Sequence, residues 1–125
     1  IFLTELNVYN LNLTRGFAVN SFLKNCDPFI KTHERASVMG QNPKVIWITG
    51  LSGSGKSTIA RSVDRELFKR SHKSFVLDGD NLRSGLNNDL DFSKKSRTEN
   101  IRRASEVSYL LYSSGLIVIS AFISP

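Results

Sequence analysis

The chain has 125 residues, of which 17 are basic and 11 acidic, and a formal net charge of +6. Its single cysteine, Cys26, excludes an intrachain disulfide framework and favours a reducing compartment, so we expect a cytoplasmic protein. No apolar run approaches the roughly 18 residues that a membrane helix needs. The length allows one domain but is short for an open α/β sheet of about five strands.

The positive charge is concentrated in the second part of the chain. Residues 43–125 hold 13 of the 17 basic residues but only 8 of the 11 acidic ones. A basic surface suits an anionic partner such as a nucleotide. Because basic residues are not interleaved with aromatic ones here, the pattern disfavours nucleic acid.

Residues 1–30 show neither a helical nor a strand period and end near the turn signal Asp27-Pro28. We leave three interpretations open for them: an extension packed on the domain, the tail of a preceding domain, or a disordered arm. Residues 31–125 form the predicted domain. It begins with a short helix over Thr32–Met39, which Gly40 ends.

A phosphate-binding loop follows the first predicted strand, Val45–Ile48. Residues 50–57 read G-L-S-G-S-G-K-S and match the pattern G-x-x-x-x-G-K-S. The glycines let backbone N–H groups turn inward on an anion, and the helix that begins near Lys56 points its positive end at the same place. The alternative is a Gly/Ser linker that matches the pattern by chance. Such a linker would not be expected to carry a Lys at this position between an apolar strand and an amphipathic helix.

The next elements alternate between helix and strand. Ile59, Val63 and Leu67 recur every four residues, which predicts a helix with one buried stripe. Apolar strands are predicted at 75–77 and 116–119. Between them, Ser93–Ser113 reads as a helix. Its expected capping box is Ser96 with Glu99, its inner face is Ile101, Ala104, Val107, Leu110 and Leu111, and its C-cap is Gly115. This order predicts an α/β fold, a three-layer arrangement with a parallel sheet flanked by helices.

Two carboxylates follow the second predicted strand, where ligands bind in open α/β sheets. Asp78 has the position of a carboxylate that orients Mg²⁺ or its water, and Asp80 could accept a proton from a substrate hydroxyl. A solvated turn is the alternative, since Asp-Gly and Asp-Asn are common turn pairs. The strand end opposite a phosphate loop favours the functional interpretation.

Other candidates lie downstream. Arg83 and Arg97 carry guanidinium groups that suit phosphate or sulfate, although ordinary surface arginines are the alternative. Phe92 is either a core aromatic or a ring that stacks on a base. Four further cations, Lys94, Lys95, Arg102 and Arg103, are more typical of a solvated helix face than of ligands.

Five blocks together resemble adenylyl-sulfate kinase (APS kinase), a P-loop kinase family. They are W-I-T-G-L-S-G-S-G-K-S-T at 47–58, L-D-G-D-N-L-R at 77–83, D-L-D-F-S at 89–93, R-T-E-N-I-R-R at 97–103 and F-I-S-P at 122–125. Their order and spacing agree with the family from about Thr32 to Pro125. The resemblance implies a P-loop NTPase-type sheet, of which 31–125 would be the N-terminal part.

The resemblance also implies a reaction and a site. ATP, with Mg²⁺, would phosphorylate the ribose 3′-hydroxyl of adenylyl sulfate (APS) to give 3′-phosphoadenylyl sulfate (PAPS) in sulfate assimilation. Asp80, Lys56 and Asp78 would be catalytic, and Ser57 and Asp78 would hold the metal. The ATP phosphates would bind Gly50, Leu51, Ser52, Gly53, Ser54, Gly55, Lys56, Ser57 and Thr58. APS would bind Asp80, Arg83, Phe92, Arg97, Asn100, Ile101, Ile123 and Ser124.

The resemblance carries departures and alternatives. Ser84 replaces a frequent His, and Asp91 replaces a common Gly, which predicts a strained turn if a positive φ is needed. Because the chain ends before the lid that closes over ATP, we expect a truncated kinase of low activity. The alternatives are another small-molecule kinase and a non-catalytic nucleotide-binding module. The family suggests a homodimer and a fusion or association with sulfate adenylyltransferase.

Overall fold

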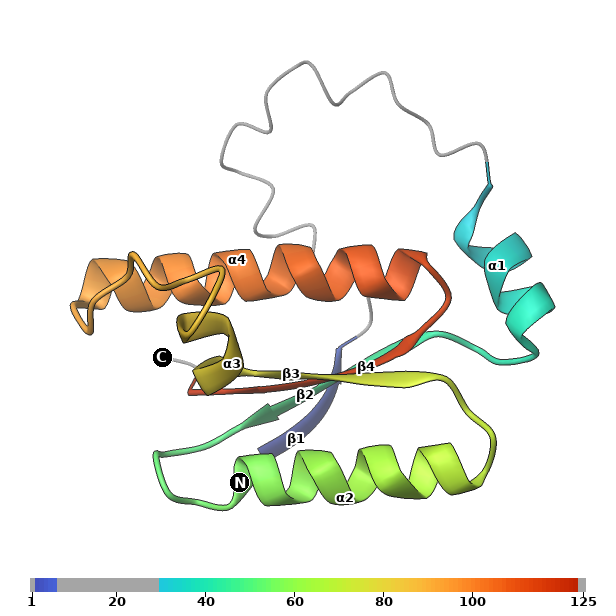
Figure 1. Ribbon diagram of the computed structural model, residues 1–125, viewed down its shortest axis with the longest axis horizontal. Coiled ribbons are helices and arrows are strands. Elements are labelled where there is room, and N and C mark those ends of the chain that lie inside the picture. Colours follow the sequence, from blue (N-terminus) through green and yellow to red (C-terminus); the bar gives the residue numbers. More distant parts are fainter. Residues whose placement is uncertain (1, 7–29, 124–125) are drawn as a thin grey trace.

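The structure is a computed structural model that describes residues 2–6 and 30–123 (Figure 1). Its elements are β1 Phe2–Leu6, α1 Thr32–Met39, β2 Lys44–Thr49, α2 Lys56–Lys69, β3 Ser74–Asp78, α3 Gly79–Arg83, α4 Lys94–Ser113 and β4 Ile117–Phe122. The sheet has the order β1-β2-β4-β3, and β4 pairs in parallel with both β2 and β3. Figure 1 shows α4 over one face of this sheet and α2 over the other. The predicted parallel α/β architecture is confirmed.

An antiparallel edge strand extends the predicted parallel sheet. β1 pairs with β2 in the register Phe2↔Thr49 to Leu6↔Val45. This strand falls in the segment to which the sequence assigned no element. Because a five-residue edge strand is held by backbone hydrogen bonds, its formation depends on the free edge of β2 rather than on a local hydrophobic period.

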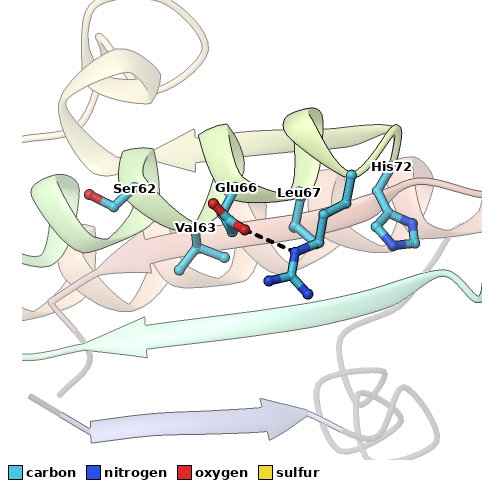
Figure 2. Close-up of a pocket in the computed structure, with 6 residues that line it drawn as sticks. Ser62, Val63, Glu66, Leu67 and His72 are labelled. Carbon is cyan, nitrogen blue, oxygen red and sulfur yellow. Dashed lines mark hydrogen bonds and ion pairs between the residues drawn. The ribbon is translucent and has the colours of Figure 1, made fainter.

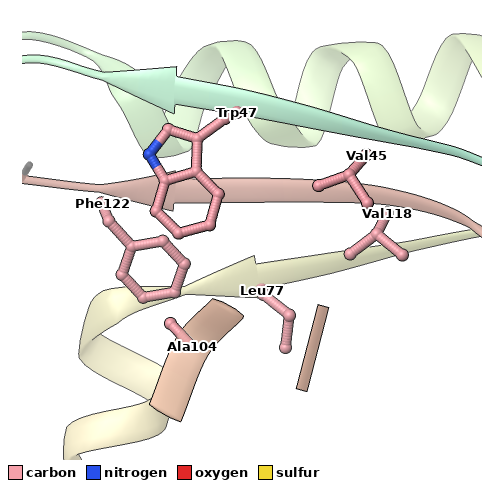
Figure 3. Close-up of a cluster of buried hydrophobic side chains, with 6 residues drawn as sticks. All are labelled: Val45, Trp47, Leu77, Ala104, Val118 and Phe122. Carbon is pink, nitrogen blue, oxygen red and sulfur yellow. The ribbon is translucent and has the colours of Figure 1, made fainter. Parts of the chain in front are cut away.

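The buried strands divide their side chains between two hydrophobic clusters, one on each face of the sheet. Figure 3 shows the cluster on the α4 side, made of Val45, Trp47, Leu77, Ala104, Val118 and Phe122. The cluster on the α2 side contains Ile48, Ala60, Ile119 and Ala121. All six residues of β4 are buried, which is the pattern of a central parallel strand. The rings of Trp47 and Phe122 stack with centroids 5.2 Å apart, close to the end of the sheet that carries the phosphate loop.

The helices bury most of the residues expected to face the sheet. Ile59, Val63 and Leu67 of α2 pack on the second cluster, as predicted. On α4, the prediction holds for four of the five inner residues but is wrong for Leu110, which is 66% exposed. Adjacent residues of an α-helix are rotated by about 100° around its axis, so the Leu110 side chain lies off the buried stripe to which Leu111 belongs.

The predicted capping box at the start of α4 is wrong. Ser93, not Ser96, is the N-cap, and its Oγ accepts a hydrogen bond from the Ser96 N–H at 3.2 Å. The C-cap is Ser114, and Gly115 follows it with φ +97°. The last strand starts at Ile117 and runs to Phe122, three residues beyond the predicted apolar run.

Gln41 ties together the segments that lead into the sheet. Its Nε2 donates to the carbonyls of Lys73 (2.8 Å) and Gly115 (2.9 Å), and its Oε1 accepts from the Lys73 N–H (2.8 Å). Since these residues precede β2, β3 and β4, one buried amide aligns the starts of all three parallel strands.

Ion pairs hold the segment between α3 and α4 against α4. Arg103 donates to both carboxylate oxygens of Asp89, at 2.7 and 2.8 Å, and its Nε donates to Glu99 at 2.9 Å. Glu99 also accepts two hydrogen bonds from Arg102. The guanidinium groups of Arg102 and Arg103 are therefore paired with carboxylates on a partly exposed face of α4.

Gly115→Ala should destabilise the fold. The positive φ costs an L-residue roughly 1–2 kcal/mol, and the new Cβ would lie 2.9 Å from Met39 Sδ. Gly85→Ala is the matched control, because its Cβ would meet no atom within 4 Å. Urea unfolding should give a lower midpoint for Gly115→Ala than for Gly85→Ala; equal midpoints would contradict the assigned backbone conformation.

Stability should fall in acid partly through Glu99. Hydrogen bonds from Arg102 and Arg103 lower the pKa of Glu99 from 4.5 to about 2 in the folded state. Its contribution to the free energy of unfolding is therefore complete above about pH 5 and is lost as the pH falls toward 2. Thermal melts of Glu99→Gln should lose less stability over this range than the parent chain. Glu106→Gln, an exposed residue of the same helix, should follow the parent; a parent-like slope for Glu99→Gln would refute the role of the pair.

Candidate functional site

The parallel register brings the predicted site segments to one edge of the sheet. Thr49 of β2 is level with Phe122 of β4, and Asp78 of β3 is level with Ala121. The phosphate loop after β2, helix α3 after β3 and Ile123 after β4 therefore start from neighbouring strand ends. This is the edge at which open α/β sheets bind ligands.

The phosphate loop has the geometry of an anion cradle. Gly53 and Gly55 take positive φ values of 72° and 87°, and no atom lies within 4 Å of where a Cβ would stand on either. Ser54 Oγ is the one buried side-chain oxygen or nitrogen without a hydrogen-bond partner in the described part of the chain. An open backbone cradle with an unsatisfied hydroxyl fits a phosphate group.

Lys56 and Ser57 occupy the first positions of α2. Lys56 Nζ folds back and donates to the carbonyl of Leu51 at 2.5 Å, so the ammonium group stays over the loop. The first turn of α2 contains no acidic residue. The positive end of the helix dipole is thus not offset by a carboxylate of that turn, which suits the binding of an anion.

The two predicted carboxylates differ in environment. Asp78 is 9% exposed and caps α3, since its Oδ1 accepts the Asp80 N–H at 3.0 Å. Asp80 itself is exposed on the first turn of α3. In the described residues no group of three or more His, Cys, Asp or Glu side chains could hold a metal.

Arg83, the last residue of α3, lies against the ring of Phe92. The Arg83 guanidinium carbon is 4.5 Å from the centre of the Phe92 ring, and Arg83 Nη1 donates to the carbonyl of Leu90 at 3.1 Å. Phe92 is 72% exposed, so its alternative role as a core aromatic is wrong. The strained turn suggested at Asp91 is also wrong, because among described non-glycine residues only Ser71 has a positive φ. Hydrogen bonds from Ser93 and Ser96 instead lower the pKa of Asp91 to about 2.

Helix α4 carries three further candidates. Arg97 is exposed, and Asn100, three residues on, is 7% exposed and accepts a hydrogen bond from Asn87. Ile101 is half-buried against the α4-side cluster. Ile123, after β4, is 51% exposed. Ser124 and Cys26 lie outside the described residues.

Two residues near the site were not predicted from the sequence. Asn87 is fully buried, and Arg103 contacts its side chain and holds Asp89. A buried asparagine in a polar loop has no periodic signal. The bidentate geometry of Arg103 with Asp89, which are 14 residues apart, appears only once the loop has folded back on α4.

A separate hollow of about 350 Å³ lies along α2, away from the strand ends (Figure 2). It is lined by Ser62, Val63, Glu66, Leu67, Arg70 and His72. Two of these residues, Arg70 and Glu66, form an ion pair at 2.9 Å, and none of the predicted site residues line the hollow. None of the described helices is long and apolar enough to span a membrane.

Comparisons with known proteins show the family of the chain. A family profile described as adenylylsulphate kinase matches residues 42–125. An adenylyl-sulfate kinase of Bacteroides thetaiotaomicron is 54% identical over 99 residues, which cover 79% of this chain and 49% of the relative. A bifunctional enzyme CysN/CysC of Xylella fastidiosa is 55% identical over 73% of this chain and 15% of its own length. The chain spans about half the length of the stand-alone curated relatives it matches.

Solved structures give the same result. The APS kinase CysC of Mycobacterium tuberculosis, solved in complex with AMPPNP and APS, has 52% sequence identity and a TM-score of 0.65. The match covers 67% of this chain and 49% of that one. The family profile spans most of the described residues, and it agrees with the sheet and with the position of the phosphate loop at the end of a strand. The chain belongs to the adenylylsulphate kinase family.

Proposed function

We propose that this chain supplies the phosphate loop and the acceptor-binding elements of an ATP-dependent kinase that phosphorylates the 3′-hydroxyl of APS to give PAPS. The observation that carries the proposal is the common sheet edge, from which the phosphate loop and α3 both start. A relative solved with both AMPPNP and APS supports the pairing of these two substrates.

The donor half is residues 50–58. The open glycine backbone, the unpaired Ser54 hydroxyl and the Lys56 ammonium suit the ATP phosphates. Ser57 and Asp78 are the residues that would hold Mg²⁺, which when bound neutralises charge on the phosphates. Because phosphoryl transfer depends mainly on positioning and on cations around the spreading charge, this loop needs no covalent chemistry of its own.

The acceptor half lies on α3 and α4. In the proposed reaction Asp80 accepts the proton of the 3′-hydroxyl, that oxygen bonds to the γ-phosphorus, and the bond between the β–γ bridging oxygen and the γ-phosphorus breaks to release ADP. Arg83, Arg97 and Asn100 would bind the phosphosulfate and ribose. Phe92, Ile101, Ile123 and Ser124 would enclose the acceptor adenine.

We further propose that the chain acts within a longer protein or assembly. Similarity to bifunctional enzymes supports a fusion or association with sulfate adenylyltransferase. One relative is a hexameric APS kinase, whereas the homodimer expected from the family stays a prediction. The cytoplasmic location and the domain boundary at residue 31 also stay predictions.

Lys56→Ala should remove nucleotide binding and turnover. Mg-ATP at a hundredfold excess over its Kd should stabilise the parent chain by about 2.7 kcal/mol in a thermal melt, and Lys56→Ala should lose most of this gain. In an intact version of the protein, PAPS formation in a coupled assay should fall roughly a hundredfold or more, because the cation acts on the transferring group. Lys69→Ala, an exposed lysine at the other end of α2, should behave like the parent.

The two measurements separate the alternatives. If Lys56→Ala keeps most of the PAPS formation, the assignment of the phosphate loop is wrong. If an intact version binds both ATP and APS tightly but forms no PAPS, the non-catalytic nucleotide-binding alternative is favoured instead.

A further inference from the structure

Asn87 joins the two helices that carry the proposed acceptor site. It is fully buried, and its backbone N–H donates to the carbonyl of Leu82 in α3 at 2.7 Å. Its side-chain Nδ2 donates to Asn100 Oδ1 in α4 at 3.0 Å. Through its backbone and its buried side chain, this one residue connects the helix of Asp80 and Arg83 with the helix of Arg97 and Asn100.

The direction of this hydrogen-bond chain is set by Arg103. Arg103 Nη1 donates to Asp89 at 2.7 Å and to the Leu86 carbonyl at 3.1 Å, and it makes a longer, shared contact with Asn87 Oδ1 at 3.4 Å. Because a guanidinium group can only donate, this contact favours the oxygen of the Asn87 amide on the side of Arg103. The amide of Asn87 then points its Nδ2 at Asn100, and Asn100 must turn its own Oδ1 toward Asn87. Arg103 is itself held by Asp89 and Glu99, which prevents it from turning away.

The remaining polar atom of Asn100 is a hydrogen-bond donor. Its Nδ2 donates to no other residue in the part of the chain that the structure describes, yet it is not among the enclosed, unpaired polar atoms. The residue keeps 7% of its surface exposed. An amide N–H in this position suits an oxygen acceptor, such as a ribose hydroxyl or a phosphosulfate oxygen.

We propose that Asn87 is a positioning residue for the acceptor nucleotide. Arg103 orients the amide of Asn87, and Asn87 in turn orients the amide of Asn100. The N–H group of Asn100, rather than its carbonyl, then faces APS. This inference rests on the proposed function, because it takes APS as the ligand of Asn100.

Asn87→Asp tests the direction of these hydrogen bonds, because the Asp side chain has nearly the same shape as the Asn side chain. The new carboxylate still accepts from Arg103 but cannot donate, so Asn100 should turn and present its carbonyl to the ligand. Calorimetric titration of the full chain should show the Kd for APS rising about tenfold or more, as expected when a donor is lost and an acceptor faces the ligand oxygens. The Kd for Mg-ATP should not change. Asn88→Asp, the same charge change at the exposed neighbouring residue, should leave the APS affinity unchanged.

A double-mutant cycle separates positioning from general destabilisation. In an Asn100→Ala background, adding Asn87→Asp should weaken APS binding by less than a further factor of two. The Asn100 amide, through which Asn87 affects APS, is absent in this background. Side-chain amide exchange by NMR should show a protected Asn87 NH₂ and a faster Asn100 NH₂ in the parent. An equal loss of APS affinity with and without Asn100, or a protected Asn100 NH₂ with an exposed Asn87 NH₂, would overturn the proposal.

The failures of the two proposals are distinguishable. A parent chain that does not bind APS would overturn the proposed function and with it the ligand of this inference. A parent chain that binds APS as tightly as Asn87→Asp does would overturn the inference alone.

Discussion

The parallel pairing of β4 with both neighbours is the constraint on which the rest of the structure depends. All six of its residues are buried, and its register holds the ends of β2 and β3 level with its own. Because the strands run the same way, every connection at their carboxyl ends opens at one edge of the sheet. At the opposite edge, the Gln41 amide aligns the strand starts. The phosphate loop and α3 have their places because of this alignment.

The two halves of the proposed site are held by different kinds of interaction. The phosphate loop depends on backbone conformation, with two glycines at positive φ and an unpaired hydroxyl. The acceptor half depends on charged and amide side chains that link α3, the following segment and α4, with Arg103 at their centre. A phosphate-donor site that is built mainly from backbone groups needs few particular side chains. An acceptor-nucleotide site that is built from side chains needs further residues to orient those side chains. This difference explains why Asn87 and Arg103, which orient other side chains, lie on the acceptor side.

Much of the fold follows from local sequence patterns. The apolar runs, the four-residue stripe of α2 and the glycine at the end of α1 each reflect an interaction within a few residues, and these predictions are confirmed. The errors concern interactions between distant segments or choices between similar caps. β1 needs the free edge of β2, and Ser93 competes with Ser96 for the same helix start. The site follows the same rule: the motif predicts the phosphate loop, whereas the contact of Arg83 with Phe92 and the burial of Asn87 require the folded segment.

In the proposed site, one sheet edge divides into a donor half and an acceptor half. NMR titration of the ¹⁵N-labelled chain, first with Mg-AMPPNP and then with APS, tests this directly. We predict that AMPPNP shifts the amides of residues 50–58, whereas APS shifts the amides and side chains of Arg83, Phe92, Arg97, Asn100 and Ile123. Shifts from both ligands confined to the phosphate loop, or APS shifts elsewhere on the chain, would contradict this division of the site.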